Sequence, residues 1–442
     1  MSITNSKKNH ILQKDAPIHN WYQFVLGYPP HLVQYYIKKF EINRNNIVLD
    51  PFCGTGTTPV ECMKHNITNY GIDANPIACF ASSVKTTLDL NIAEINEYQG
   101  YIAESAKASM QYHGLKDPLS LLIEPKTSLK HLIVRNIPDL SAEQRKIIPR
   151  GFISEKPLFK VLLLKLIINS IGDAKVRDFF LLALANLIVK KAGNIGFGPE
   201  IYVTKPKNDV DALSSYISIT SRMIHELELN QHHNAQTFII NGDSRKIDTC
   251  LNRDLLGKID CVITSPPYPN EKDYTRTTRL ESVLLGFIAD KKGLREQKEM
   301  LLRSNSRNIF FQDTDGDYVK KFKSIEEIAQ TIENKRIDLN KTSGFEKMYS
   351  KIVRHYFGGM YLHLKSLKPF LNEGAKLAYV VGDQMSFFRI NIPTSQLLAE
   401  LAEDLDYIII DTELWRTRLA TATKKQLNEN VLILENQSVL GE

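Results

Sequence analysis

The stretch that decides the fold is Asn-Ile-Val-Leu-Asp-Pro-Phe-Cys-Gly-Thr-Gly-Thr-Thr, at residues 46–58. Residues 46–49 are an apolar run that predicts a buried parallel strand, and the stretch from Pro59 to Lys64 predicts a helix. Between them, Gly54 and Gly56 let the backbone approach a ligand closely and set its amides at a helix N-terminus. The pattern lacks the third glycine of a dinucleotide fingerprint and the Gly-Lys-Ser/Thr of a P-loop. It therefore predicts the first β–α turn of a doubly wound fold with a different ligand.

Acidic residues follow three of the predicted strands. Asp50 stands at the tip of the first strand, where a carboxylate can meet a cationic amino group. Asp73 ends a second strand, residues 69–72, at the position from which an acid reaches ribose hydroxyls in a doubly wound fold. A third strand, residues 237–240, leads to Asp243. The sequence thus predicts three carboxylates at one edge of the sheet.

A second informative stretch is Ser-Pro-Pro-Tyr at residues 265–268, directly after the apolar run 259–263. Two prolines fix φ and remove two backbone donors, so the backbone there presents carbonyl groups only. Ser265 adds a hydroxyl acceptor, and Tyr268 adds an aromatic face. Such a cluster can accept hydrogen bonds from an exocyclic amino group while stacking the ring that carries it. The alternative is a strand that ends in a rigid structural turn.

Together these motifs resemble the S-adenosylmethionine-dependent DNA amino-methyltransferases, which methylate cytosine N4 or adenine N6. Residues 50–58 resemble the family's methionine-binding motif, Asp73 its ribose-binding acid, and Asp243 the acid near the cofactor adenine. The stretch 19–40 is similar to its amino-terminal cofactor motif. The resemblance covers roughly half of the chain. It implies a cofactor site made of Tyr28, Pro30, Asp50, Pro51, Phe52, Cys53, Gly54, Thr55, Gly56, Asp73 and Asp243, and a catalytic site made of Ser265, Pro266, Pro267 and Tyr268.

The resemblance leaves the target base open. Serine in the first catalytic position, Ser265, is similar to the N4-cytosine enzymes, whereas Asp or Asn is more usual in N6-adenine enzymes. The order of the motifs points the other way, because many N4-cytosine enzymes carry the catalytic motif first and here the glycine motif comes first. We expect N4-cytosine methylation of a flipped base in DNA, with N6-adenine methylation as the alternative and an RNA amino-methyltransferase as a third reading.

Chemistry of this kind needs neither a metal nor a covalent intermediate. Ser265 and the carbonyl of Pro266 would accept the amino hydrogens, and Tyr268 would hold the base by stacking. No Pro-Cys dipeptide is present, which argues against C5-cytosine methylation with its cysteine nucleophile. The five cysteines form no C-x-x-C pair and have no histidine at metal-ligand spacing, so we expect reduced thiols and no metal site.

Composition is compatible with this interpretation. The 442 residues carry a formal net charge of +6, a mild basic excess that suits a polyanionic partner such as double-stranded DNA. The first residues are polar and contain no apolar core of a secretion signal, and the apolar stretch 161–171 is too short to span a bilayer. We expect a cytoplasmic protein without membrane contact. The resemblance also raises a cognate restriction endonuclease as a partner.

The chain is expected to form an α/β fold, a doubly wound seven-stranded Rossmann-like methyltransferase sheet with a mainly helical inserted domain. Residues 1–87 and 236–442 would form the methyltransferase core, with a loop insertion at about 290–345. Residues 88–235 would form a helical target-recognition domain. Within the loop insertion, the charged stretch 312–342 lacks a clear apolar face and is expected to be a mobile loop that orders on DNA.

Basic residues near the catalytic motif are candidates for DNA contacts. Arginine and asparagine make bidentate contacts to guanine and adenine edges. Such residues occur in the stretch 270–279 and in the short basic, amide-rich run 303–308. The candidates are Lys272, Arg276, Arg279, Arg303 and Arg307. An ordinary surface turn is the alternative for the second stretch.

Overall fold

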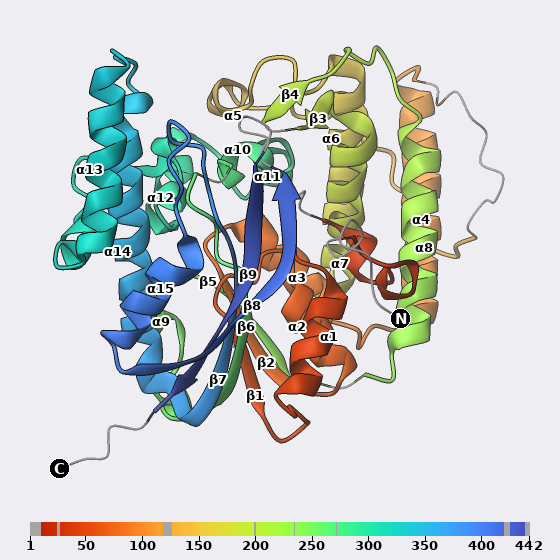
Figure 1. Cartoon of the computed structure of the whole chain (residues 1–442). Coiled ribbons are helices and arrows are strands. Elements are labelled where there is room, and N and C mark those ends of the chain that lie inside the picture. Colours follow the sequence, from red (N-terminus) through yellow and green to blue (C-terminus); the bar gives the residue numbers. More distant parts are fainter. Residues whose placement is uncertain are drawn as a thin grey trace.

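The computed structural model describes residues 10–23, 27–115, 117, 126–198, 200–233, 235–270, 272–419 and 425–437. Its centre is a seven-stranded sheet in the order β5-β2-β1-β6-β7-β9-β8 (Figure 1). The first five strands in this order run parallel, and β9 is antiparallel to both of its neighbours. The strands are β1 (Ile47–Asp50), β2 (Thr68–Asp73), β5 (Thr237–Asn241), β6 (Ile259–Thr264), β7 (Leu371–Gly382), β8 (Tyr407–Leu419) and β9 (Gln426–Asn436). The prediction of a doubly wound seven-stranded sheet is confirmed.

The strand order places a topological switch between β1 and β6. From β1 the chain adds β2 and then β5 on one side, and then returns to add β6 and β7 on the other side. Val48 and Leu49 of β1 pair in register with Cys261 and Val262 of β6. In open α/β sheets, ligands bind outside the carboxyl ends of the strands at such a switch. The two strands that flank this position are the ones that carry the glycine motif and the Ser-Pro-Pro-Tyr motif.

Helices cover both faces of the sheet, as a mostly parallel sheet requires. One face packs against α1 (Pro30–Lys39) and α2 (Thr57–Lys64), with Val48, Cys261 and Ala378 in this core. The other face packs against α14 (Tyr349–Leu367) and α15 (Thr394–Glu403), with Leu49 and Val262 in that core. Successive strand residues thus alternate between two buried faces. The remaining helices beside the sheet are α3 (Pro76–Thr86) and α9 (Ile247–Cys250).

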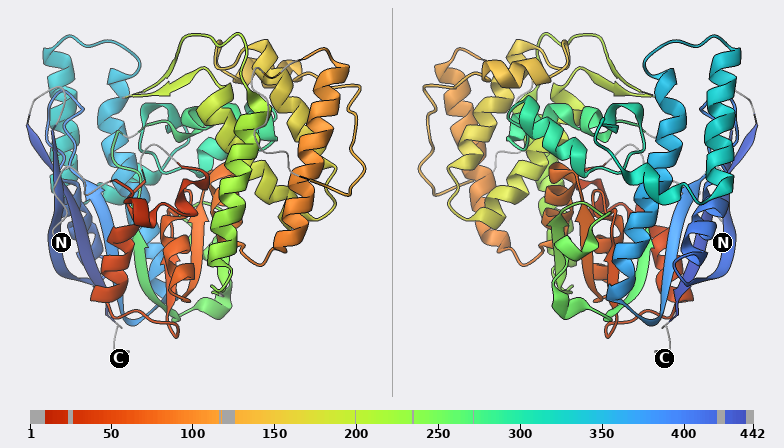
Figure 2. Two further views of the ribbon diagram at one scale, coloured as in Figure 1. Left: turned by 90° about the vertical axis from the view of Figure 1, so that its right-hand side faces the viewer. Right: turned by 90° about the vertical axis from the view of Figure 1, so that its left-hand side faces the viewer.

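The segment between α3 and β5 is mainly helical and lies on the opposite side of the molecule from β8 and β9 (Figure 2). Its helices pack on one another and on α3, and Ile77, Ala81 and Val84 of α3 belong to the same hydrophobic core. The glycine-rich stretch around residue 196 forms a small antiparallel hairpin. The elements are α4 (Ile92–Tyr112), α5 (Ala142–Ile147), α6 (Glu155–Asn169), α7 (Ala174–Leu187), β3 (Ile195–Phe197), β4 (Ile201–Val203) and α8 (Ala212–Asn230).

The expectation of a mobile loop at residues 312–342 is wrong. Most of this stretch forms α13 (Lys323–Asp338), which packs against α14. The apolar face of α13 consists of only Ile325, Ala329 and Ile332, which recur at helical spacing and are fully buried. Upstream lie α10 (Tyr274–Thr277), α11 (Arg279–Leu285) and α12 (Lys291–Met300). The region at 290–345 is therefore largely helical rather than a loop.

The carboxyl-terminal third completes the sheet. Helix α14 begins at Tyr349, and β8 and β9 form the antiparallel edge of the sheet. Residues 372–374 lie inside β7, where the pairing with β6 skips from Leu371 to Lys376 and Gly374 adopts a φ of +72°. A left-handed glycine allows the strand to bulge outward without ending.

Candidate active site

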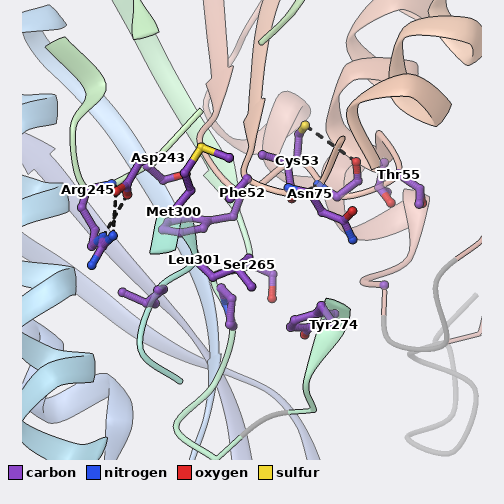
Figure 3. A pocket seen from close by; sticks show the side chains of 18 of the residues that line it. Phe52, Cys53, Thr55, Asn75, Asp243, Arg245, Ser265, Tyr274, Met300 and Leu301 are labelled. Carbon is purple, nitrogen blue, oxygen red and sulfur yellow. Dashed lines mark hydrogen bonds and ion pairs between the residues drawn. The ribbon is translucent and has the colours of Figure 1, made fainter. Parts of the chain in front are cut away.

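A cavity opens at the carboxyl ends of the central strands. Seven segments line it: the region around Tyr28, the glycine motif, the three turns after β2, β5 and β6, the short helix α10, and the end of α12. In Figure 3, Asp243 and Arg245 lie to one side, Thr55 and Asn75 to the other, and Ser265 below them. The lining includes the sequence-predicted residues Tyr28, Phe52, Cys53, Gly54, Thr55, Asp73, Asp243, Ser265 and Pro267. The structure thus brings the four motifs together.

The glycine motif is shaped by two left-handed glycines, Gly54 at φ +50° and Gly56 at φ +88°. Gly56 caps the start of α2, and a Cβ there would lie 2.5 Å from the hydroxyl of Ser82 on α3. It therefore permits close packing of the two helices and does not line the cavity. Gly54 does line the cavity, and its amide donates to Asp73. Pro51 is buried, and its carbonyl accepts the hydroxyl of Ser244.

Asp50 lies beneath the cavity rather than in it. Its side chain is fully buried and accepts hydrogen bonds from the hydroxyls of Tyr28 at 2.5 Å and Thr264 at 2.6 Å, and from the amide of Phe52 at 3.1 Å. Burial raises the pKa of Asp50 to about 6, although these donors oppose the rise. Asp50 is not among the residues that line the cavity, so the structure gives it no contact with a cationic ligand group. It holds the glycine motif against β6 and the segment around Tyr28.

Asp73 ends β2 and faces the cavity. Its two oxygens accept backbone amides, from Gly54 at 2.9 Å and from Asn75 at 2.8 Å. These bonds fix the carboxylate, and the remaining lone pairs of its oxygens can accept from hydroxyl groups. Burial raises the pKa of Asp73 to about 6, and the two amide donors oppose that rise. The geometry suits an acceptor of paired hydroxyls.

Asp243 lines the other end of the cavity as part of an ion-pair network. The guanidinium of Arg245 binds both its oxygens, at 2.9 Å and 2.7 Å. The same guanidinium donates to Asp315 at 2.6 Å, and these two carboxylates raise the pKa of Arg245 although burial opposes the rise. Sequence reasoning identified Asp243 but missed Arg245, although it stands only two residues further on. Its partner Asp315 is distant in sequence and gave no signal.

Within the catalytic motif, Ser265 and Pro267 line the cavity, whereas Pro266 is buried and does not. The hydroxyl of Ser265 donates to the carbonyl of Val380 on β7 at 3.1 Å. Because its single proton is used in this bond, the oxygen lone pairs are left to accept a hydrogen from a ligand.

Tyr268 lies behind the cavity rather than in its wall. Its hydroxyl donates to Glu429 at 3.0 Å, and Glu429 accepts from Arg416 at 2.6 Å. Burial and the neighbouring Glu429 raise the pKa of Tyr268 well above its usual value. The ring packs on the backbone of Gly382, where an added Cβ would lie 2.8 Å from it. The hydroxyl of Tyr268 is therefore held by the buried carboxylate of Glu429, and its ring is held by the backbone of β7.

The candidate DNA contacts divide into two groups. Arg279 and Arg303 are only 7% and 4% exposed, and they bind the carbonyl of Thr275 and the carboxylate of Asp313. The contacts of both side chains are therefore internal, and in this structure neither is exposed for contact with DNA. Lys272 donates to the carbonyl of Gly198 at 2.6 Å.

Arg276 and Arg307 remain available at the surface. Arg276 is partly exposed and lies 3.8 Å from Glu200. Arg307 is exposed and lies over the ring of Phe345. Pro30 is buried as the first residue of α1 and does not line the cavity.

Sequence reasoning also missed several residues of the cavity wall. Asn75 follows the predicted acid Asp73 by two residues, so its position was a usable signal. For Tyr274 and the apolar residues 300–302 the sequence contains no such signal. They belong to α10 and to the end of α12, and only the tertiary fold brings these elements to the cavity. Among the described residues no cluster of His, Cys, Asp and Glu could hold a metal ion. In the same part of the chain no helix is long and apolar enough to span a bilayer.

Comparison with known proteins agrees with this geometry. Residues 3–82 match a family described as DNA methylase. The type II methyltransferase M.BsoBI of Geobacillus stearothermophilus is 25% identical over 89% of this chain and 79% of its own. M.AvaI of Nostoc sp. strain PCC 7120 is 22% identical over 89% and 80%. M.MjaII of Methanocaldococcus jannaschii is 38% identical over 16% and 14%. These matches, with the sheet order and the motifs at its switch point, support an assignment to the S-adenosylmethionine-dependent amino-methyltransferases.

Proposed function

We propose that the protein transfers a methyl group from S-adenosylmethionine to the exocyclic N4 amino group of a cytosine flipped out of double-stranded DNA. The observation that carries this proposal is the shared cavity: Asp73, Asp243 and Ser265 line one space, although they come from three different strands. Cytosine is favoured because serine occupies the first catalytic position. A nuclease that cuts the same DNA sequence is a proposed partner, on the strength of relatives described as type II methyltransferases.

The residues present fit this cofactor. Asp73, fixed by two backbone amides, would accept the ribose hydroxyls. Asp243 would accept from the adenine amino group, and Phe52, Leu301 and Leu302 supply apolar surface for a flat ring. When bound, the cofactor supplies an electrophilic methyl group on a sulfonium.

The chain's own residues would position and polarise the amine. The lone pairs of Ser265 Oγ accept one amino hydrogen, since its proton is bound to Val380. The carbonyl of Pro266, in the peptide bond to the cavity-lining Pro267, would accept the other hydrogen, which leaves the nitrogen lone pair free for an in-line displacement. As the N–C bond forms and the C–S bond of the sulfonium breaks, the nitrogen becomes positive and the same two acceptors stabilise its hydrogens. One of these protons is then lost to solvent, which gives the neutral methylated base. Orientation of this kind supplies most of the acceleration; the amino nitrogen is itself the nucleophile, so no nucleophilic side chain of the protein is required.

The cysteine nearest to the reaction supports this scheme. Cys53 lines the cavity, but burial raises the pKa of its thiol well above the usual value, so it stays protonated near neutral pH. A protonated, buried thiol is a poor nucleophile. Cys53 therefore serves as a small residue that packs below the cofactor site.

We also propose that residues 88–235 read the DNA sequence. The β3–β4 hairpin of this segment reaches the catalytic side of the core, where Gly198 accepts from Lys272 and Glu200 lies near Arg276. Tyr202 and Val203 on β4 are exposed, at 53% and 44%. A two-stranded ribbon is one of the elements that fit the major groove of DNA.

N6-adenine methylation is the second candidate, favoured by one observation. The glycine motif precedes the catalytic motif in this chain, which resembles the order in an adenine-methylating branch. The acceptors at Ser265 and Pro266 would serve an adenine amino group equally well.

One experiment separates these outcomes. The protein is expressed in a bacterial host that lacks DNA methylation, genomic DNA is digested, and the nucleosides are identified by mass spectrometry. We expect N4-methylcytosine; N6-methyladenine would support the second candidate. Single-molecule sequencing of the same DNA then gives the recognition sequence. Ser265→Ala is the matched control, since it should remove the modification while the protein still binds S-adenosylmethionine. DNA without any modified base would refute the proposal.

A further inference from the structure

Phe311 has the most exposed large hydrophobic side chain in the described part of the chain, with a relative exposure of 106%. Single exposed hydrophobic residues are common and by themselves need no explanation. Phe311 differs because the backbone that carries it is rigidly held. Its neighbour Phe310 packs against two guanidinium groups, those of Arg295 at 5.5 Å and Arg303 at 5.3 Å from the ring centre.

A tight turn presents Phe311 to solvent. The amide of Asp313 donates to the carbonyl of Phe310 at 3.2 Å, and the amide of Phe310 donates to the side chain of Asp313 at 2.6 Å. Asp313 also binds Arg303 through two hydrogen bonds of 2.8 Å, and both side chains are almost fully buried. A paired, buried arginine and carboxylate form strong bidentate bonds. The turn therefore holds the backbone that carries Phe311 in a fixed position and directs its side chain to solvent.

Both ends of this segment are attached to the wall of the cavity. Upstream, Leu301 and Leu302 line the cavity, and Ser304 accepts from the amide of Asn270, two residues after the catalytic motif, at 2.7 Å. Downstream, Asp315 binds Arg245, which in turn holds Asp243 in the cavity (Figure 3). The exposed ring is thus built onto the frame of the active site.

We propose that Phe311 is a wedge that enters the base stack of duplex DNA and fills the space left when the target base moves into the cavity. The inference rests on the proposed function, because it needs DNA as the substrate. Apolar side chains that insert between base steps separate them, and a flipped base leaves such a gap. Arg307, which is exposed four residues upstream, can bind the backbone phosphates beside the wedge.

The test measures single-turnover methyl transfer to two duplexes that carry the recognition sequence found above. In the first the target base is paired, and in the second it lies opposite an abasic site, so that flipping needs little help. The variants are Phe311→Ala, Phe311→Trp as the conservative change, and Leu256→Ala as the control. Leu256 is 46% exposed and lies three residues before β6, at the amino end of that strand, whereas the cavity lies at the carboxyl ends of the strands. Thermal unfolding confirms that each variant is folded.

We expect Phe311→Ala to slow methylation of the paired duplex roughly ten- to hundredfold, the loss typical of one base–aromatic stack. On the duplex with the unpaired target its rate should return to near that of the wild type. Phe311→Trp and Leu256→Ala should match the wild type on both. Equal slowing of Phe311→Ala on the two duplexes, or no slowing on either, would overturn the wedge. A wild-type protein that methylates neither duplex would instead overturn the proposed function, and the wedge with it.

Discussion

Gly382→Ala tests whether the position of Tyr268 controls the reaction without a change in any motif residue. The added Cβ would lie 2.8 Å from Cε2 and 3.1 Å from Cδ2 of the Tyr268 ring. An ordinary contact begins near 3.4 Å, so the ring must move by about 0.6 Å. The hydrogen bond to Glu429 resists this shift. Overpacking costs about 1–3 kcal/mol, and a shift of Tyr268 would also move the catalytic motif that carries Ser265, where a misplacement of about 1 Å can cost roughly a hundredfold in rate.

We therefore expect Gly382→Ala to slow methyl transfer roughly tenfold while the affinity for S-adenosylmethionine stays unchanged, since Gly382 does not line the cavity. The assay is a double-mutant cycle with Tyr268→Ala, followed by single-turnover methylation and by calorimetry of cofactor binding. In the Tyr268→Ala background there is no ring to displace, so Gly382→Ala should have no further effect. The reasoning fails if Gly382→Ala slows the reaction equally in both backgrounds, or if the single variant keeps the wild-type rate.

Four other predictions concern charge and burial. The raised pKa of Asp73 is about 6, and a protonated carboxyl cannot accept both ribose hydroxyls. Calorimetry should therefore show that the affinity for the cofactor falls by up to about tenfold per pH unit below pH 6. Asp73→Asn should bind the cofactor weakly and without this pH dependence. Cys53→Ala should keep most methyl transfer, and complete loss of activity with intact cofactor binding would contradict its structural role. Arg303→Gln leaves Asp313 buried without its ion pair and should lower the free energy of unfolding by about 3–5 kcal/mol. Arg307→Gln should leave thermal stability unchanged, but the slope of log affinity for DNA against log salt concentration should become smaller by about one, as for the loss of one phosphate contact. Equal melting temperatures for the two arginine variants would contradict the distinction between a buried Arg303 and an exposed Arg307.

Much of the fold followed from local patterns in the sequence. Apolar runs ending in Asp50, Asp73 and Ser265 predicted parallel strands whose carboxyl ends meet at one edge, and all three strands are present there. Such runs are informative because a strand buried on both faces is apolar throughout. The glycine motif likewise predicted a strand, a tight turn and a helix, since each depends on residues that are neighbours in sequence.

A helix with a small apolar face is hard to predict from sequence. Only three small or branched residues, Ile325, Ala329 and Ile332, form the buried face of α13, so its sequence shows little helical periodicity. The long helix α14 against which they pack supplies the burial that makes this face sufficient. Helical stability in proteins comes mainly from such packing rather than from intrinsic preference.

The roles of individual site residues depended on contacts between distant parts of the chain. Glu429, which holds Tyr268, lies 161 residues away in sequence, and Asp315, which binds Arg245, lies 70 residues away. Asp50 had the expected position at a strand tip, yet its partner Thr264, 214 residues distant, turns it away from the cavity. The sequence by itself determined which chemical groups gather at the switch point, because strand ends are set locally. Only the tertiary structure decided which of them face the ligand, because burial and hydrogen-bond partners are supplied by other strands.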